Sequence, residues 1–229
     1  FFEQEKPDVL LLKEVLEKDL GKLSQSLEMQ PVFTPLCQYL EAEISGTPQI
    51  FGLATYSRLK ILSSSISYYS GQREPLPVLR KGYQEGHKAS RAFIKTVVEK
   101  GSDKFCLVNT HFTWTPDGMP NEQQRRDLRK MLRLLSATPE LILCGDFNAP
   151  RGREIFDKLA HVYKDNVPSD VTTTIDRNLH YKKNLELVVD GLFTTKGYQA
   201  QNVKVVNGLS DHCAIVANVT IKKLKNGGD

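Results

Sequence analysis

Acidic, amide and imidazole side chains recur in this sequence at the points where short apolar segments end. The residues at these points are Glu14, His111, Asp146, Asn148, Asp190, Asp211 and His212. Taken singly, a strand-end Asp or Asn is usually a turn or capping residue, because its side chain bonds the nearby backbone. If the strand ends share one rim of a sheet, the side chains converge, and such groups together can transfer protons and hold a hard cation.

The segments between these residues predict alternating strands and helices. Strands are expected at 9–12, 50–56, 60–67, 92–99, 105–111, 141–144, 185–193 and 213–221. The four consecutive strands from 50 to 111 are expected to form one sheet. Leu16, Leu20, Leu23 and Leu27 share one helical face, and residues 121–135 form a second amphipathic helix. This mixture favours an α/β sandwich over a purely doubly wound parallel sheet.

Composition predicts a folded chain with one core. The chain has 229 residues, of which 40% are hydrophobic, 25% charged and 8% aromatic, so disordered and fibrous classes are excluded. This length predicts a single domain over residues 1–229. The formal net charge of +4 permits an anionic partner but does not require one. No apolar run approaches the roughly 18 residues of a membrane-spanning helix.

Cysteine usage and the start of the chain bear on the compartment. Cys37, Cys106, Cys144 and Cys213 are widely spaced and form no CxxC pair, and the last three lie in or beside apolar runs. They are expected to be free, buried thiols. No basic segment followed by an apolar stretch opens the chain, so no signal peptide is expected. Together these features predict a reducing, cytoplasmic environment.

Four segments, taken in order, make the sequence similar to a known group. They read PDVLLLKEV at 7–15, NTHF at 109–112, GDFNAP at 145–150 and SDH at 210–212. With them the chain resembles the endonuclease/exonuclease/phosphatase superfamily of deoxyribonuclease I-like, metal-dependent phosphoesterases, from Pro7 to Ile221. The resemblance implies a four-layer α/β sandwich, in which two mixed β-sheets lie face to face with helices outside.

The resemblance also implies a divalent metal at one rim of the sandwich, Mg²⁺ or alternatively Mn²⁺. Glu14 matches the metal-binding glutamate of the family, and Asp211 is positioned to help hold the ion or its water. Mg²⁺ prefers oxygen ligands and retains water, so one or two carboxylates suffice.

Two departures from the family pattern affect this metal site. Lys13 stands where a glutamine usually precedes the metal-binding glutamate, and it either points away, as alternation along a strand predicts, or competes with the cation. The family's first strand, which carries an asparagine near the metal, is expected to precede Phe1. Both departures keep open an alternative function, a binding or scaffolding module with little or no turnover.

The reaction implied by the resemblance is in-line displacement at a phosphate ester, with a phosphodiester preferred over a monoester. His212 matches the general base that takes a proton from the attacking water, and Asp190 fixes its tautomer and stabilises the imidazolium. Asp146 and Asn148 would place the nucleophile and bind a phosphoryl oxygen. His111 fits the position that donates to the phosphate or to the leaving oxygen.

The residue that orients His212 has two candidates in the sequence. Asp190 ends the apolar run 187–189, only 22 residues before His212, whereas Asp176 lies in an Ile-Asp pair of a type common in the family. Asp190 is preferred. Thr174, Asp176 and His180 then belong either to a loop near the substrate or to a simple polar connection.

The substrate is less well defined than the reaction. Trp114, the only tryptophan, is either a platform for a base or ring, or a residue packed against the rim. A basic stripe on the helix expected at 121–135 consists of Arg125, Arg126, Arg129, Lys130 and Arg133. Such a stripe can track phosphates but is more commonly a solvated face, so nucleic acid is possible but not indicated. Nucleotide-binding glycine loops and the serine hydrolase elbow are absent from the sequence.

Overall fold

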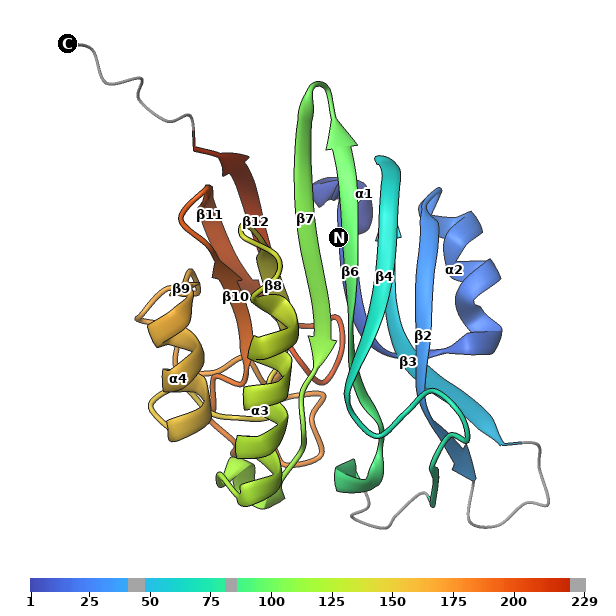
Figure 1. Ribbon diagram of the computed structural model, residues 1–229, viewed down its shortest axis with the longest axis vertical. Helices are drawn as coiled ribbons and strands as arrows, with labels where there is room; N and C mark the ends of the chain where they lie inside the picture. Colours follow the sequence, from blue (N-terminus) through green and yellow to red (C-terminus); the bar gives the residue numbers. More distant parts are fainter. Residues whose placement is uncertain (41–47, 81–85, 223–229) are drawn as a thin grey trace.

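Two β-sheets packed face to face form the centre of the protein in the computed structural model, which describes residues 1–40, 48–80 and 86–222 (Figure 1). Helices lie on the outer sides, with α2 over one sheet and α3 and α4 over the other (Figure 1). The expected four-layer α/β sandwich is therefore confirmed.

The first sheet has the strand order β1-β3-β2-β5. Its strands are β1 Val9–Leu16, β2 Gln30–Leu40, β3 Gln49–Ser57 and β5 Val78–Arg80. β3 pairs with β1 and β2 in antiparallel fashion, whereas β2 and β5 are parallel, so the sheet is mixed as expected.

The second sheet has the order β4-β6-β7-β8-β10-β9. Its strands are β4 Lys60–Ser70, β6 Arg91–Lys100, β7 Asp103–His111, β8 Ile142–Asp146, β9 Lys164–Asp165 and β10 Asp190–Thr194. This sheet is also mixed, because β7 and β8 are parallel while the other pairings are antiparallel. The parallel pair requires a crossover connection, which is supplied by α3.

Helices and one hairpin complete the fold. The helices are α1 Phe2–Glu5, α2 Leu20–Leu27, α3 Glu122–Leu135 and α4 Glu154–Val162. Asn121 caps α3 by accepting a hydrogen bond from the Gln124 backbone N–H, and the helix buries an apolar stripe that includes Leu128 and Met131. β11 Tyr198–Val206 and β12 Ala214–Ile221 form a separate antiparallel pair. Among the described residues, no helix combines the length and apolar character that a membrane crossing would need.

The two sheets are joined by an apolar interface and by hydrogen bonds that side chains of β4 and β7 make with the first sheet. Leu53 of β3 and Ile94 of β6 are fully buried in the same apolar cluster, which removes facing surfaces of both sheets from water. Asn109 of β7 reaches across and donates hydrogen bonds from its side-chain amide to the carbonyl oxygens of Leu12 and Ala54, both at 3.1 Å. The Asn109 link is one of the contacts that set how the strand ends of the two sheets are placed relative to each other.

The predicted elements are mostly present, with three corrections. The strand predicted at 50–56 is β3 and belongs to the first sheet, whereas β4, β6 and β7 form part of the second, because the chain changes sheets at the turn after Ser57. Leu16 ends β1 and does not begin the helix. The strand predicted at 185–193 begins only at Asp190, after a segment without strand pairing.

The cysteines are free, as expected, but only one is fully buried. Cys37 is 4% exposed, whereas Cys106, Cys144 and Cys213 are half-buried, because each of these three lies in or next to a strand with one partly open face. Burial raises the pKa of Cys37 and of Cys144 to about 12, so both groups are neutral thiols at pH 7.

Gly145 is required by the close approach of β7 and β8. A Cβ atom there would lie 2.3 Å from the Thr110 carbonyl oxygen, which belongs to the paired strand. Gly145→Ala is expected to lower the free energy of unfolding by about 1–3 kcal/mol, measured by urea denaturation. Gly21→Ala is the matched control, because its new methyl group would meet nothing within 4 Å on α2. A fully stable Gly145→Ala protein would contradict the packing.

Candidate active site

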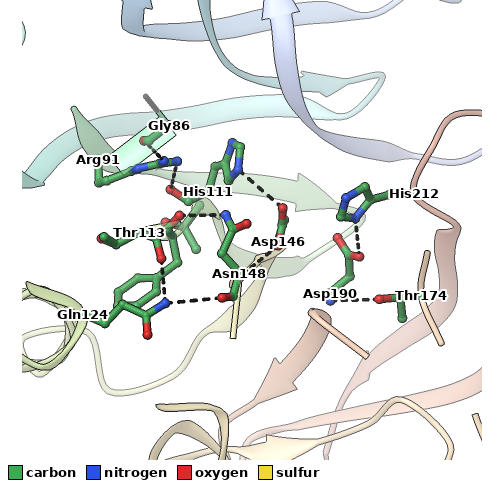
Figure 2. Close-up of polar contacts among 12 residues, drawn as sticks. Gly86, Arg91, His111, Thr113, Gln124, Asp146, Asn148, Thr174, Asp190 and His212 are labelled. Carbon is green, nitrogen blue, oxygen red and sulfur yellow. Dashed lines mark hydrogen bonds and ion pairs between the residues drawn. The ribbon is translucent and has the colours of Figure 1, made fainter. Parts of the chain in front are cut away.

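Three neighbouring strands of the second sheet place a histidine and two aspartates side by side. His111 at the end of β7 is in register with Asp146 at the end of β8, and Asp146 is in register with Asp190 at the start of β10. Residues in register on neighbouring strands point to the same face of a sheet, so these side chains meet at one rim (Figure 2). The predicted convergence of these strand ends is therefore present.

His212 completes this row from the segment before β12. Its Nδ1 atom lies 2.7 Å from Asp190 Oδ2. Asp190 is held in turn, because the Thr174 hydroxyl accepts hydrogen bonds from the backbone N–H groups of Asp190 at 3.1 Å and Val189 at 3.0 Å (Figure 2). The structure thus places Asp190, and not Asp176, against the imidazole.

The charge state of His212 is governed by its acidic neighbours. Burial alone would lower the pKa of His212, but the charge and hydrogen bond of Asp190, followed by the charges of Asp146 and Asp211, raise the pKa to about 10. With no cation in place, the imidazolium is therefore the favoured form. The bond to Asp190 occupies Nδ1, so Nε2 is the nitrogen left for substrate chemistry.

Asp146 is a buried carboxylate held in its ionised form. Burial raises its pKa, but the His111 hydrogen bond and the nearby His212 charge outweigh burial and hold the pKa of Asp146 below its usual range. His111 Nε2 lies 3.4 Å from Asp146 Oδ2. Asp146 Oδ1 also accepts the Asn148 backbone N–H at 2.7 Å, and the Asn148 amide donates to the Phe112 carbonyl oxygen at 3.0 Å.

Glu14 reaches the site from the opposite sheet. It lies in an irregularity of β1 between Leu12 and Val15 and has a φ of 57°, a conformation that non-glycine residues adopt at some cost. This local distortion exposes the Glu14 side chain to a cavity that Asp146 also lines. The positive charge of Lys13, which precedes it, lowers the pKa of the Cys144 thiol and so opposes the larger effect of burial on that group.

The donor atoms around this cavity fit a hard divalent cation. Glu14, Asp146 and Asp211 all line it, and each offers carboxylate oxygens of the kind that Mg²⁺ and Mn²⁺ prefer. Ligand atoms of Asp146, Asp190 and His212 lie within 4.8 Å of one another. Because Asp190 and His212 already bond each other, the carboxylates of Glu14, Asp146 and Asp211 are the better ligand set.

The cavity has a volume of about 860 Å³, which is large enough for a substrate with several groups. Trp114 and His180 line this cavity together with Asn148, and the His180 and His212 ring centroids are 6.2 Å apart. Thr174 is fully buried beneath Asp190. Asp176 is also buried, and its carboxylate accepts backbone N–H groups of Asn178, Leu179 and Gly208, which fixes the loop that carries His180.

Sequence reasoning did not identify the opposite wall of the cavity. It consists mainly of apolar and aromatic side chains from β2, β3 and β5, and Arg91 of β6 also contributes to it. The apolar residues include Leu36, Cys37, Tyr39, Phe51 and Leu79. The apolar residues of this wall have the same signature as core residues. Arg91 did carry a signal, because it is a charged residue directly before the apolar run 92–94 at the start of β6.

This fold and rim define a known class of proteins. A model of the Endonuclease/Exonuclease/phosphatase family matches residues 1–212. The chain therefore belongs to this family, as the four sequence segments predicted. No significant match is found among curated proteins.

Solved structures share the fold at low sequence identity. An endonuclease/exonuclease/phosphatase from Bacteroides vulgatus is 16% identical with a TM-score of 0.72, and the match covers 97% of this chain and 88% of that chain. A Bacteroides thetaiotaomicron mannosyl-6-phosphatase is 14% identical, with a TM-score of 0.65 and coverage of 96% and 88%. D. rerio TDP2, complexed with a single-stranded DNA product, is 16% identical, with a TM-score of 0.63 and coverage of 96% and 88%.

Proposed function

We propose that this protein is a Mg²⁺-dependent phosphodiesterase, with Mn²⁺ as an alternative cation. The observation that carries the proposal is the Asp190–His212 pair at 2.7 Å, which lies beside an ionised Asp146 in a cavity shared with Glu14 and Asp211. An oriented imidazole next to hard oxygen ligands suits the attack of water on a phosphate ester. The family and its similarity to a phosphatase and to TDP2 support phosphate-ester chemistry.

Different residues of the chain have different roles in this proposed reaction. His212 takes a proton from the attacking water through Nε2, while Asp190 holds the ring and stabilises the imidazolium that forms. Asn148 and His111 offer neutral or charged N–H donors to phosphoryl and leaving oxygens, and donors of this kind lower the barrier where negative charge develops. When bound to Glu14, Asp146 and Asp211, a divalent cation would offset their charge and polarise the phosphate ester.

The large, partly apolar cavity favours a diester over a monoester. A phosphodiester carries a group on each side of phosphorus, and the volume of about 860 Å³ accommodates substituents on both sides. Trp114 and the β2–β3 wall offer apolar surface to such a group.

Hydrolysis of bis-p-nitrophenyl phosphate tests the proposal. The rate in Mg²⁺ buffer is expected to fall more than about tenfold with EDTA and to return with excess Mg²⁺ or Mn²⁺, because the cation contributes several kcal/mol of charge stabilisation. p-Nitrophenyl phosphate serves as the monoester comparison and is expected to react more slowly. A hydrolysis rate that EDTA leaves unchanged would contradict the metal requirement. A folded protein without any hydrolysis would favour a binding or scaffolding module.

A further inference from the structure

Arg91 is a buried cation in the wall of the active-site cavity. It begins β6, which runs antiparallel to β7, so it lies at the rim where β7 ends at His111. Arg91 is only 3% exposed to solvent, yet it contributes to the cavity lining. A charge in this position is costly unless it is paired or meets an ionic ligand.

The protein pairs this guanidinium only in part. It donates to the carbonyl oxygens of Gly86 at 2.6 Å and His111 at 3.4 Å, and its Nε–H is buried without an acceptor. In the described part of the chain, no carboxylate lies within ion-pair distance of it. Because a guanidinium has five N–H donors in a planar fork, it retains donors for an anion with two oxygens, such as phosphate.

Arg91 lies away from the position proposed for the reacting phosphate. The contacts run from Arg91 to the His111 backbone, from the His111 ring to Asp146, and from Asp146 toward the Asp190–His212 pair (Figure 2). Arg91 is therefore at the far side of His111 from His212. A phosphate bound there would be a different group from the one that His212 and Asp146 attack.

A ring platform lies next to this position. The side chain of Trp114 packs against Gly86, where an added Cβ would lie 3.6 Å from the indole, and Arg91 bonds the carbonyl oxygen of the same glycine. A base stacked on Trp114 and a phosphate bound to Arg91 would thus lie next to each other in one wall of the cavity.

We propose that Arg91 forms a second phosphate subsite, which binds a phosphate group of the substrate other than the one cleaved. This inference rests on the proposed phosphodiesterase function and names the substrate class, a nucleotide-containing phosphodiester with a second phosphate. An inositol phosphate with two phosphate groups offers the same anionic chemistry without a base.

Binding measurements can test the subsite without turnover. Isothermal titration in Mg²⁺ buffer compares thymidine 3′,5′-bisphosphate with thymidine 5′-monophosphate, and inositol 1,4-bisphosphate with inositol 1-monophosphate. The wild-type protein is expected to bind the thymidine bisphosphate about 10- to 100-fold more tightly than the monophosphate, as charge-assisted hydrogen bonds imply. A preference for the bisphosphate in the inositol pair alone would overturn the nucleotide assignment, and equal binding within both pairs would overturn the subsite.

Arg91→Gln is expected to abolish the preference for the thymidine bisphosphate, and Arg91→Lys to weaken it, because lysine keeps the charge but not the fork. The matched control is Arg151→Lys. Arg151 also has a buried Nε without an acceptor, but it pairs with Asp165 at 2.8 Å and lies in another part of the structure. An unchanged preference in folded Arg91→Gln would overturn the inference.

A measurement on the wild-type protein covers the case in which Arg91→Gln fails to fold. In ¹H–¹⁵N spectra, the arginine Nε–H resonance that is present in the wild-type protein and missing from Arg91→Lys is assigned to Arg91. It is expected to shift with thymidine bisphosphate and much less with the monophosphate, and equal responses would overturn the subsite. Hydrolysis of bis-p-nitrophenyl phosphate is scored separately, so a failed binding test with intact hydrolysis rejects only this inference.

Discussion

His212→Ala is expected to lower kcat/KM for bis-p-nitrophenyl phosphate by about 10²- to 10⁴-fold, the range attributed to general acid–base catalysis. The alanine removes the imidazole whose Nδ1 is held by Asp190, and with it the Nε2 atom that is proposed to accept the proton of the attacking water. Because His212 is partly exposed, with 29% of its side chain accessible, the fold is expected to survive the change. Steady-state kinetics in saturating Mg²⁺ measure the effect.

His161→Ala provides the control for this prediction. His161 lies exposed near the end of α4, so its removal tests the loss of an imidazole without touching the cavity. Wild-type rates in His161→Ala together with wild-type rates in His212→Ala would reject the assigned base. Circular dichroism spectra of both variants show whether a loss of rate reflects a loss of folding.

Asp190→Asn is expected to reduce kcat by about 10²- to 10⁴-fold, because in hydrolytic triads the corresponding change leaves the histidine in the wrong tautomer. The amide is nearly isosteric with the carboxylate and keeps the position above Thr174, but it removes the negative charge. The KM for bis-p-nitrophenyl phosphate is expected to change far less than kcat, since Asp190 acts on His212 and not on the substrate.

Histidine titration by NMR separates this positioning role from a structural one. In the metal-free protein, burial lowers the pKa of His212 while Asp190 and the other carboxylates raise it to about 10. The removal of the Asp190 charge is therefore expected to move the titration to lower pH. Asp170→Asn, a change at an exposed residue, is the control, and a His212 titration that is the same in both variants would contradict the pairing.

The sequence predicted the members of this rim better than the path of the chain. Asp146 and His111 were predictable because each ends a strand that contains an apolar run, and a strand end at a sheet edge is a strong positional constraint. The strand pairing that makes them neighbours was not readable, because period-two patterns do not say which sheet a strand joins. For this reason β3 was assigned to the wrong sheet.

Several elements escaped sequence reasoning for identifiable reasons. β2 contains Pro31 and Pro35, which weaken its strand signal, and β11 alternates polar with weakly apolar residues. α4 is short, and only Ile155, Phe156 and Leu159 mark its buried face. The segment before Asp190 is apolar because it lies against the cavity and core, although it has no strand partner.

The Asn109 link has a consequence for the proposed cation site. Glu14 approaches from one layer while Asp146 and Asp211 approach from the other side of the cleft, so the spacing of the oxygen ligands depends on how the layers are aligned. The amide of Asn109 ties β7 to the backbone of β1 only two residues before Glu14. Slippage between the layers would therefore disturb the proposed cation site before it unfolds the molecule, and Asn109 resists such slippage from inside the core and not from the mouth of the cleft.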